Sequence, residues 1–92
     1  MKPITEAAKL FGTTEEEILG IGRYGNVPEA RHALCLALHK SGVKNKDIQK
    51  MTGWEQSRIC KSLEIARRKN FEPEFNVKVY QIIDAIKDEK QN

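Results

Sequence analysis

Apolar residues along this chain recur with the spacing of an α-helix, and glycine or proline interrupts the runs. In the first run, ITEAAKLF, the apolar residues stand at i, i+3, i+4 and i+7, and Gly12 follows them. No stretch alternates apolar and polar residues as a half-buried strand does. The pattern therefore predicts an all-α fold, a compact domain of five or six helices.

The breaks divide the rest of the chain into further helices. The third, through ARHALCLALHK, has few polar positions, so we expect it to be the central and most buried helix. A closing helix is expected at about residues 74–88, where FNVKVYQII is amphipathic. Capping side chains are expected from Thr13 or Thr14 with Glu16 or Glu17, from Asn26 and from Asn45.

The chain has 92 residues, enough for one compact core, because a second core would need roughly 50 residues or more of its own. Cys35 and Cys60 lack the close spacing of zinc or redox motifs, which indicates a reducing setting. The first residues, MKPITEAAKL, lack the apolar centre of a signal peptide, and no apolar run is long enough to span a bilayer. We therefore expect one soluble, cytoplasmic domain over residues 1–92, with no membrane partner.

The net charge of +3 hides an uneven distribution. Residues 31–70 contain ten Lys or Arg and three Asp or Glu, a balance of +7, whereas residues 1–30 and residues 71–92 each carry −2. A basic middle between acidic flanks favours a polyanion as partner. A solvated helical face explains the same count equally well.

The segment NKDIQKMTGWEQSRICKSL has the layout of a helix-turn-helix. Ile48 and Met51 are expected to hold the first helix on the core, and Gly53 permits a tight turn. Trp54 and Ile59 then fix the second helix, so that its opening polar residues point outward. The same pattern taken alone also fits an ordinary helical corner in a protein that does not bind DNA.

In a helix-turn-helix over about residues 45–69, the start of the second helix would read base pairs in the major groove. Gln56 can bond adenine bidentately, and Arg58 can bond guanine in the same way. Ser57 can bond a base or a phosphate, and Glu55 can accept from a cytosine amino group. The other cations that we expect at the DNA are Lys46, Lys61, Arg67 and Arg68.

Nearly the whole chain, about residues 4–86, resembles the C-terminal DNA-binding domain of the bacterial replication initiator DnaA. The similar stretches are ITEAAKLFGTTEEEILG, NVPEARHALCLAL with its Val-x-x-Ala-Arg start, the helical hairpin, and FNVKVYQII. The resemblance implies a fold of the Trp-repressor-like helix-turn-helix class. It also implies that Arg23, in the glycine-rich loop GIGRYGN, enters the minor groove beside the major-groove helix.

The signature stretch of that family, Gly-Gly-Arg-Asp-His-Ser/Thr-Thr-Val, is similar to residues 52–59. In this chain Trp54 stands in place of an arginine, Gln56 in place of a histidine and Arg58 in place of a threonine. The resemblance implies that residues at these positions select the bases. The resemblance therefore implies the fold more strongly than recognition of the usual DnaA site. The sequence has no Gly-x-x-x-x-Gly-Lys-Ser/Thr phosphate loop, so we expect no nucleotide hydrolysis.

His32, Cys35 and His39 stand at i, i+3 and i+7, so one helix face could present all three to a soft metal. They supply only three ligands without identifiable supporting partners, and cysteine is often a small buried apolar residue. We therefore expect no metal and no cofactor. No nucleophile with its base and no carboxylate pair in a cleft is apparent, so we expect no enzyme.

These features together predict sequence-specific binding of double-stranded DNA, in replication or transcription regulation. Two alternatives stay open. A dimeric, ligand-responsive repressor of the Trp-repressor kind would need a stable dimer and an apolar pocket beside the hairpin. A protein-interaction module would dock an acidic partner on the basic hairpin. The expected partner besides double-stranded DNA is a second copy of the chain or a replication or transcription protein.

Overall fold

The computed structural model describes residues 2–20, 22 and 25–91, and within these residues the chain forms six α-helices and no strand. Their bounds are α1 Lys2–Phe11, α2 Glu15–Leu19, α3 Val27–Lys40, α4 Asn45–Thr52, α5 Gln56–Lys69 and α6 Pro73–Gln91. The all-α class predicted from the apolar spacing is confirmed. None of the described helices combines the length and the apolar character that crossing a bilayer requires.

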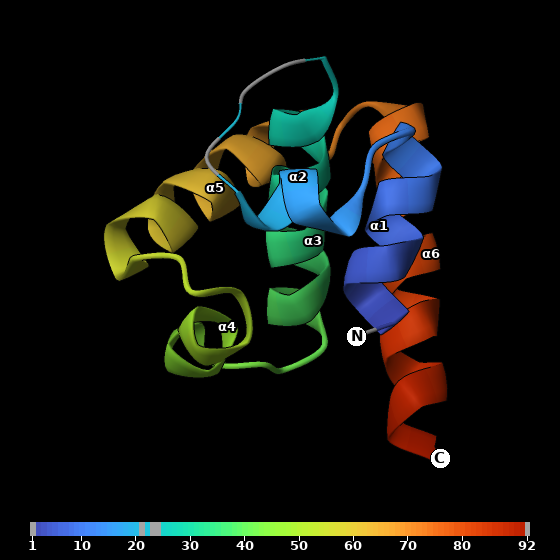
Figure 1. Cartoon of the computed structure of the whole chain (residues 1–92). Helices are drawn as coiled ribbons and strands as arrows, with labels where there is room; N and C mark the ends of the chain where they lie inside the picture. The colour runs from blue at the N-terminus through green and yellow to red at the C-terminus, as the bar shows by residue number, and fades with distance from the viewer. Residues whose placement is uncertain (1, 21, 23–24, 92) are drawn as a thin grey trace.

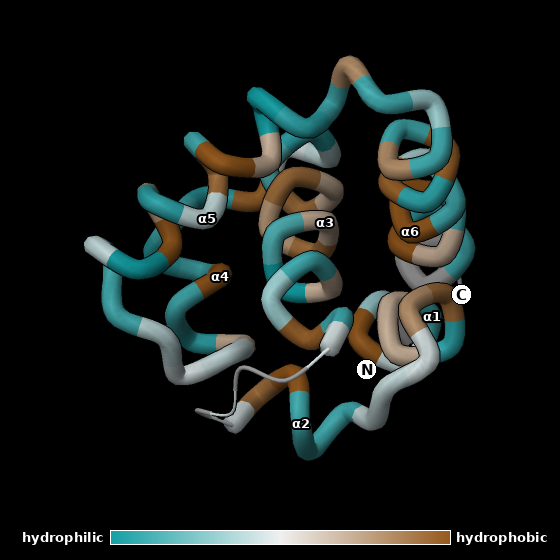
Figure 2. Tube along the Cα trace, turned by 90° about the horizontal axis from the view of Figure 1, so that it is seen from above, coloured by the Kyte–Doolittle hydropathy of each residue, from teal (hydrophilic) through white to brown (hydrophobic). Residues whose placement is uncertain are grey.

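Helix α3 runs through the middle of the molecule (Figure 1). Helices α1 and α6 pack against each other on one side of α3, whereas α4 and α5 lie on the other side. Helix α2 packs on α1 and α3. In the view from above, apolar residues of the surrounding helices turn toward α3, and polar residues face outward (Figure 2). The molecule therefore presents two separate outer surfaces, one from α4 and α5 and one from α1 and α6.

The burial of α3 and α6 follows the predicted apolar stripes. Nine of the 14 residues of α3 are buried, among them Leu34 and Ala37, so α3 is the central helix expected from its sequence. Pro28 is tolerated in its first turn, because the first backbone N–H groups of a helix have no partner within it. The predicted apolar face of α6 is buried in full: Phe75, Val79, Ile82, Ile83 and Ile86.

Thr14 caps α2, and it is one of the two threonines that the sequence predicts for this role. Its Oγ1 accepts a hydrogen bond from the backbone N–H of Glu17 at 3.1 Å, and the same hydroxyl donates to the Glu17 carboxylate at 3.2 Å. These bonds satisfy one of the free N–H groups at the helix start and hold Glu17 near the positive end of the helix dipole. A helix of five residues needs such support, because so short a helix is unstable alone.

Neither of the two asparagines that the sequence predicts as helix caps makes a capping hydrogen bond with its side chain. Asn26 stands at the N-cap position of α3, but its side-chain amide donates to the Phe11 carbonyl at 3.2 Å and ties the start of α3 to the end of α1. Asn45 is the first residue of α4, because Lys44 occupies the N-cap position, so the prediction that Asn45 caps the helix is wrong. The Asn45 amide instead lies 3.8 Å from the Cys60 sulfur on α5.

Candidate nucleic-acid interface

Helices α4 and α5 are joined by a turn of three residues, 53–55. Gly53 has a φ of +78°, in the left-handed region that favours glycine, and its N–H closes α4 by donating to the Gln49 carbonyl at 2.7 Å. Glu55 is extended and stands at the N-cap position of α5. The predicted role of Gly53 is thus confirmed, and the turn sets the direction in which α5 leaves.

The core holds α4 and α5 through residues that the sequence singled out, with one exception. Ile48 on α4 and Ile59 on α5 are fully buried, and Trp54 in the turn is 3% exposed. Met51 was expected to share the inner face of α4 and is 37% exposed, so that prediction is wrong. Helix α4 packs mainly on α5 and only its edge meets α3, which leaves it a narrow buried face at Ile48.

Seven of the nine side chains predicted to contact DNA are exposed. They are Lys46, Glu55, Gln56, Ser57, Lys61, Arg67 and Arg68. On α5, Ser57, Lys61 and Arg68 stand at i, i+4 and i+11, which places them along one outward stripe opposite the buried face. The eighth, Arg58, is half-buried. The ninth, Arg23, lies outside the described residues.

Arg58 turns back toward the molecule. Its Nη2 approaches the Gly20 carbonyl, just after α2, at 3.5 Å, and its guanidinium carbon lies 5.7 Å from the centre of the Trp54 ring. A hydrogen bond at that distance is weak, whereas a cation over an indole ring is favourable. Arg58 therefore links α5 to the end of α2, and it would leave the Gly20 carbonyl to reach a base.

Two of the cations on α5 predicted to meet phosphate have protein partners. Arg68 pairs with Glu64 one turn away at 2.8 Å, and both side chains are exposed. The Arg67 Nη2 lies 3.2 Å from the His39 Nε2, at the end of α3. An exposed i,i+4 ion pair stabilises a helix by only about 0.3–0.5 kcal/mol, so the Glu64 contact can be exchanged for a phosphate.

Arg31 is the residue that sequence reasoning missed. It is 4% exposed, and its guanidinium donates to three carbonyls at the end of α2: Ile18 at 2.7 Å, Glu17 at 2.7 Å and Gly20 at 2.8 Å. The last carbonyls of a helix have no partner within it, so Arg31 satisfies them and holds α2 against α3. A single cation inside the apolar run of residues 30–38 was the signal that could have found it.

A groove separates the starts of α3 and α5. Its lining is Pro28, Arg31, His32, Arg58, Lys61, Ser62 and Ile65. Three of these side chains are cations and none is a carboxylate, so the groove is electropositive. A ligand-responsive repressor would need an apolar pocket beside the α4–α5 pair, and the groove that lies there is lined by three cations as well as by Pro28 and Ile65.

His32, at the edge of this groove, should make stability depend on pH. Its Nδ1 is buried without a hydrogen-bond partner among the described residues, and burial, followed by the nearby Lys69 charge, lowers the pKa from its usual 6.5. Because the unfolded chain then binds a proton more readily, the free energy of unfolding should be highest above pH 6.5 and fall as pH drops toward the lowered pKa.

Urea unfolding of the wild type and of His32→Gln at several pH values between 8 and 5 checks this expectation. The substitution should flatten the decline, whereas contributions from other titrating groups remain in both proteins. An equally steep decline in the two proteins would show that His32 does not carry it.

The three residues weighed as metal ligands lie in different surroundings. Burial raises the pKa of the Cys35 thiol to about 12, so the thiolate that a metal needs is disfavoured. His32 faces the groove beside α5, and His39 is exposed beside Arg67. Across the described ranges, no group of three or more His, Cys, Asp or Glu side chains is placed to hold a metal ion.

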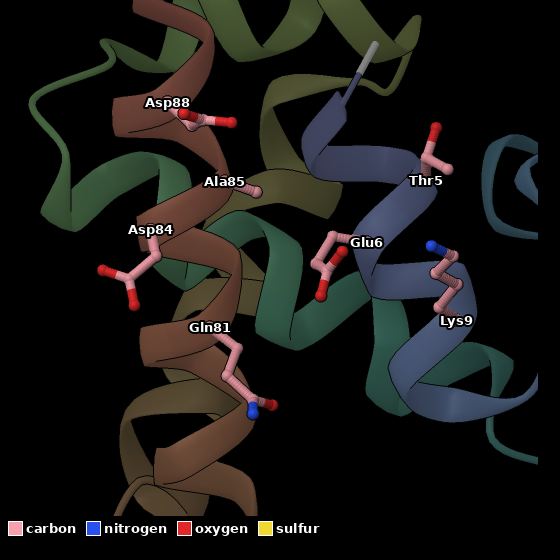
Figure 3. A pocket seen from close by; sticks show the side chains of 7 residues that line it. All are labelled: Thr5, Glu6, Lys9, Gln81, Asp84, Ala85 and Asp88. Atoms are coloured by element: carbon pink, nitrogen blue, oxygen red, sulfur yellow. The ribbon is translucent and has the colours of Figure 1, made fainter.

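A pocket on the surface formed by α1 and α6 is lined by more carboxylates than cations. Figure 3 shows this pocket between the two helices, lined by Glu6 from α1 and by Asp84 and Asp88 from α6, with Lys9 as its cation. Residues 44–69, which contain α4 and α5, hold eight Lys or Arg and three Asp or Glu. Cations are therefore in excess on the side of α3 formed by α4 and α5, whereas carboxylates outnumber the cation in this pocket.

The side of the molecule built from α4 and α5 combines a turn anchored by buried Trp54, an exposed polar start of α5 and exposed cations on α5. Donors and acceptors at a helix start suit the edges of base pairs, and the cations suit phosphates. Comparison of the chain with protein-family models, with curated proteins and with solved structures finds no match.

Proposed function

We propose that this chain binds double-stranded DNA in a sequence-specific manner, with α4 and α5 acting as a helix-turn-helix and α5 lying in the major groove. One observation carries the proposal: Gln56 and Ser57 are exposed at the start of a helix whose opposite face, including Ile59, is fully buried. A helix anchored in this way presents its polar start in one orientation, which reading base edges requires.

The groove between α3 and α5 supports the same proposal. Lys61 lines it as an exposed cation, and Arg31 and Arg58 add positive charge, so the groove attracts a phosphate of the DNA backbone. The acidic pocket between α1 and α6 lies on the other side of α3, so it would face away from the duplex.

The resemblance to the C-terminal domain of DnaA adds a second contact and a biological setting. It implies a Trp-repressor-like arrangement in which Arg23 enters the minor groove beside α5. It also implies a role in replication or transcription regulation, without an ATPase module. The changes at Gln56 and Arg58 imply a DNA site that differs from the one DnaA reads.

Selection of duplexes from a random pool, in the presence of random competitor DNA, tests the proposal. A recovered consensus is the expected result. Retention of the chain by all duplexes alike, or by none at moderate salt, would contradict sequence-specific binding and favour an acidic protein as the partner.

Substitutions on α5 should separate base reading from phosphate binding. Gln56→Ala should weaken discrimination at one base pair of the selected site by about 1–3 kcal/mol. Lys61→Ala should instead weaken binding to all sequences and reduce the slope of log affinity against log salt by about 1. Lys87→Ala on α6 removes the same charge from the other side and should change neither quantity. Equal effects of the two α5 substitutions would argue against base reading.

Removing the carboxylate from the outward side of α5 should strengthen DNA binding. Glu64→Gln takes away a charge that repels phosphate and frees Arg68 from its ion pair. We expect affinity at low salt to rise about two- to fivefold, and the gain to shrink as salt increases. Asp84→Asn on α6 changes the net charge equally and is the matched control, measured by fluorescence anisotropy on the same duplex. A similar gain from both variants would mean that only net charge matters.

A further inference from the structure

A groove with an apolar floor lies where the end of α3 meets α6, away from α4 and α5. Ile83 and Ile86 form the floor, and Tyr80, which is 53% exposed, forms a wall. Lys40 and Lys87 stand at the rim, and the Lys40 ammonium lies 5.8 Å from the centre of the Tyr80 ring. The groove therefore suits an apolar side chain that is accompanied by a carboxylate.

Ser41 adds a polar group to this groove. Its hydroxyl oxygen is buried and has no hydrogen-bond partner among the described residues. Buried polar atoms are normally paired, so a carboxylate in the groove would satisfy this hydroxyl once the Ser41 side chain turned toward the groove. The hydroxyl can donate a hydrogen bond, so it favours a negatively charged group in the groove, as the two lysines do.

The chain itself carries a segment of matching chemistry. Helix α2 has the sequence EEEIL, in which Leu19 is 39% exposed and Glu16, one turn earlier, is exposed on the same side. An exposed leucine beside a carboxylate is the complement of an apolar floor between two lysines.

A molecule cannot place its own α2 in its own groove. Helix α2 covers the junction of α1 and α3, whereas the groove lies between α3 and α6. A contact made once in a pair of copies is head-to-tail, and it leaves one free α2 and one free groove at the ends of each assembly.

We propose that two copies of this chain associate head-to-tail, with Leu19 and Glu16 of one copy in the α3–α6 groove of the other. Leu19 contacts Ile83, Ile86 and Tyr80, and Glu16 pairs with the lysines at the rim. The contact is small, so its dissociation constant is on the order of 0.1–1 mM. It involves neither the turn nor the cations of α5, so it does not depend on DNA binding.

Two variants, each with one surface disabled, test the proposal. Leu19→Glu disables α2 and keeps the groove, and Tyr80→Glu disables the groove and keeps α2. Both side chains are partly exposed, so the fold should persist, which circular dichroism checks. In NMR spectra without DNA, each variant alone should show no concentration dependence up to the millimolar range. A mixture should form a 1:1 complex whose shifts lie at the groove of Leu19→Glu and at α2 of Tyr80→Glu.

Phe71→Glu is the matched control, because it also replaces an exposed aromatic residue by glutamate, outside the groove. The Phe71→Glu variant keeps both α2 and the groove intact, so it should self-associate like the wild type. A mixture of Leu19→Glu and Tyr80→Glu without shifts at these two surfaces overturns the proposal. A wild-type chain that stays monomeric at millimolar concentration also overturns it, and leaves the groove to an acidic segment of a different protein.

Discussion

Replacing Trp54 with alanine should lower the free energy of unfolding by about 3–5 kcal/mol, because a large buried side chain leaves a cavity that the surroundings fill only in part. Trp54 is 3% exposed in the turn between α4 and α5, and it also lies beneath Arg58. Its loss should therefore loosen the start of α5 and abolish sequence-specific DNA binding. Trp54→Phe should cost less, since it keeps an aromatic ring and removes an indole N–H that is buried without a partner among the described residues.

Phe71→Ala is the control for this experiment, because Phe71 is 90% exposed in the connection between α5 and α6. Its unfolding free energy should stay within about 0.5 kcal/mol of the wild type. The measurement is urea unfolding followed by circular dichroism, since Trp54 is the single tryptophan and its fluorescence is lost in the variant. A cost for Trp54→Ala as small as that of Phe71→Ala would show that the turn is not packed as described.

Replacing Arg31 with methionine should have the second largest effect, a loss of about 3 kcal/mol or more. Methionine fills similar space but leaves the carbonyls of Glu17, Ile18 and Gly20 without the donors that Arg31 supplies. Because α2 has only five residues, it should open locally before the rest of the chain unfolds. Hydrogen exchange of the α2 amides, together with urea unfolding, would record both effects.

Arg31→Lys separates charge from geometry at the same position. A lysine keeps the positive charge, but its single ammonium cannot reach three carbonyls as the guanidinium does, so an intermediate loss is expected. Arg68→Met removes an exposed guanidinium from α5 and should change stability by less than about 0.5 kcal/mol. Faster exchange confined to α3 or α6 in Arg31→Met would contradict the role assigned to Arg31.

The local pattern of the sequence was sufficient for the helices and for the turn before α5. The apolar spacing in ITEAAKLF and FNVKVYQII predicts α1 and α6, because the residues that share a helix face are set by the helix period alone. Gly53 was predicted at the turn for a similar reason, since its positive φ is a property of one residue. Closing helix α6 extends a few residues beyond the predicted 74–88, as helix ends often do.

Side chains whose partners are distant in the sequence were not predicted. Met51 has the spacing of an inner residue, but only the packing of α4 on α5 decides which face of α4 is covered. Arg58 was expected to point outward, and it turns toward the Gly20 carbonyl, 38 residues earlier. Periodicity states which residues lie on one side of a helix, and it contains no information on what lies opposite.

The sequence by itself determined where the helices form, which of their faces are apolar, and that the positive charge is concentrated in residues 31–70. Only the tertiary structure decided that Arg31 serves α2, that Arg58 reaches Gly20, and that the acidic pocket of α1 and α6 lies across α3 from α5. The physical reason is that helix formation depends on neighbours within a turn or two, whereas these contacts depend on how whole helices pack around α3.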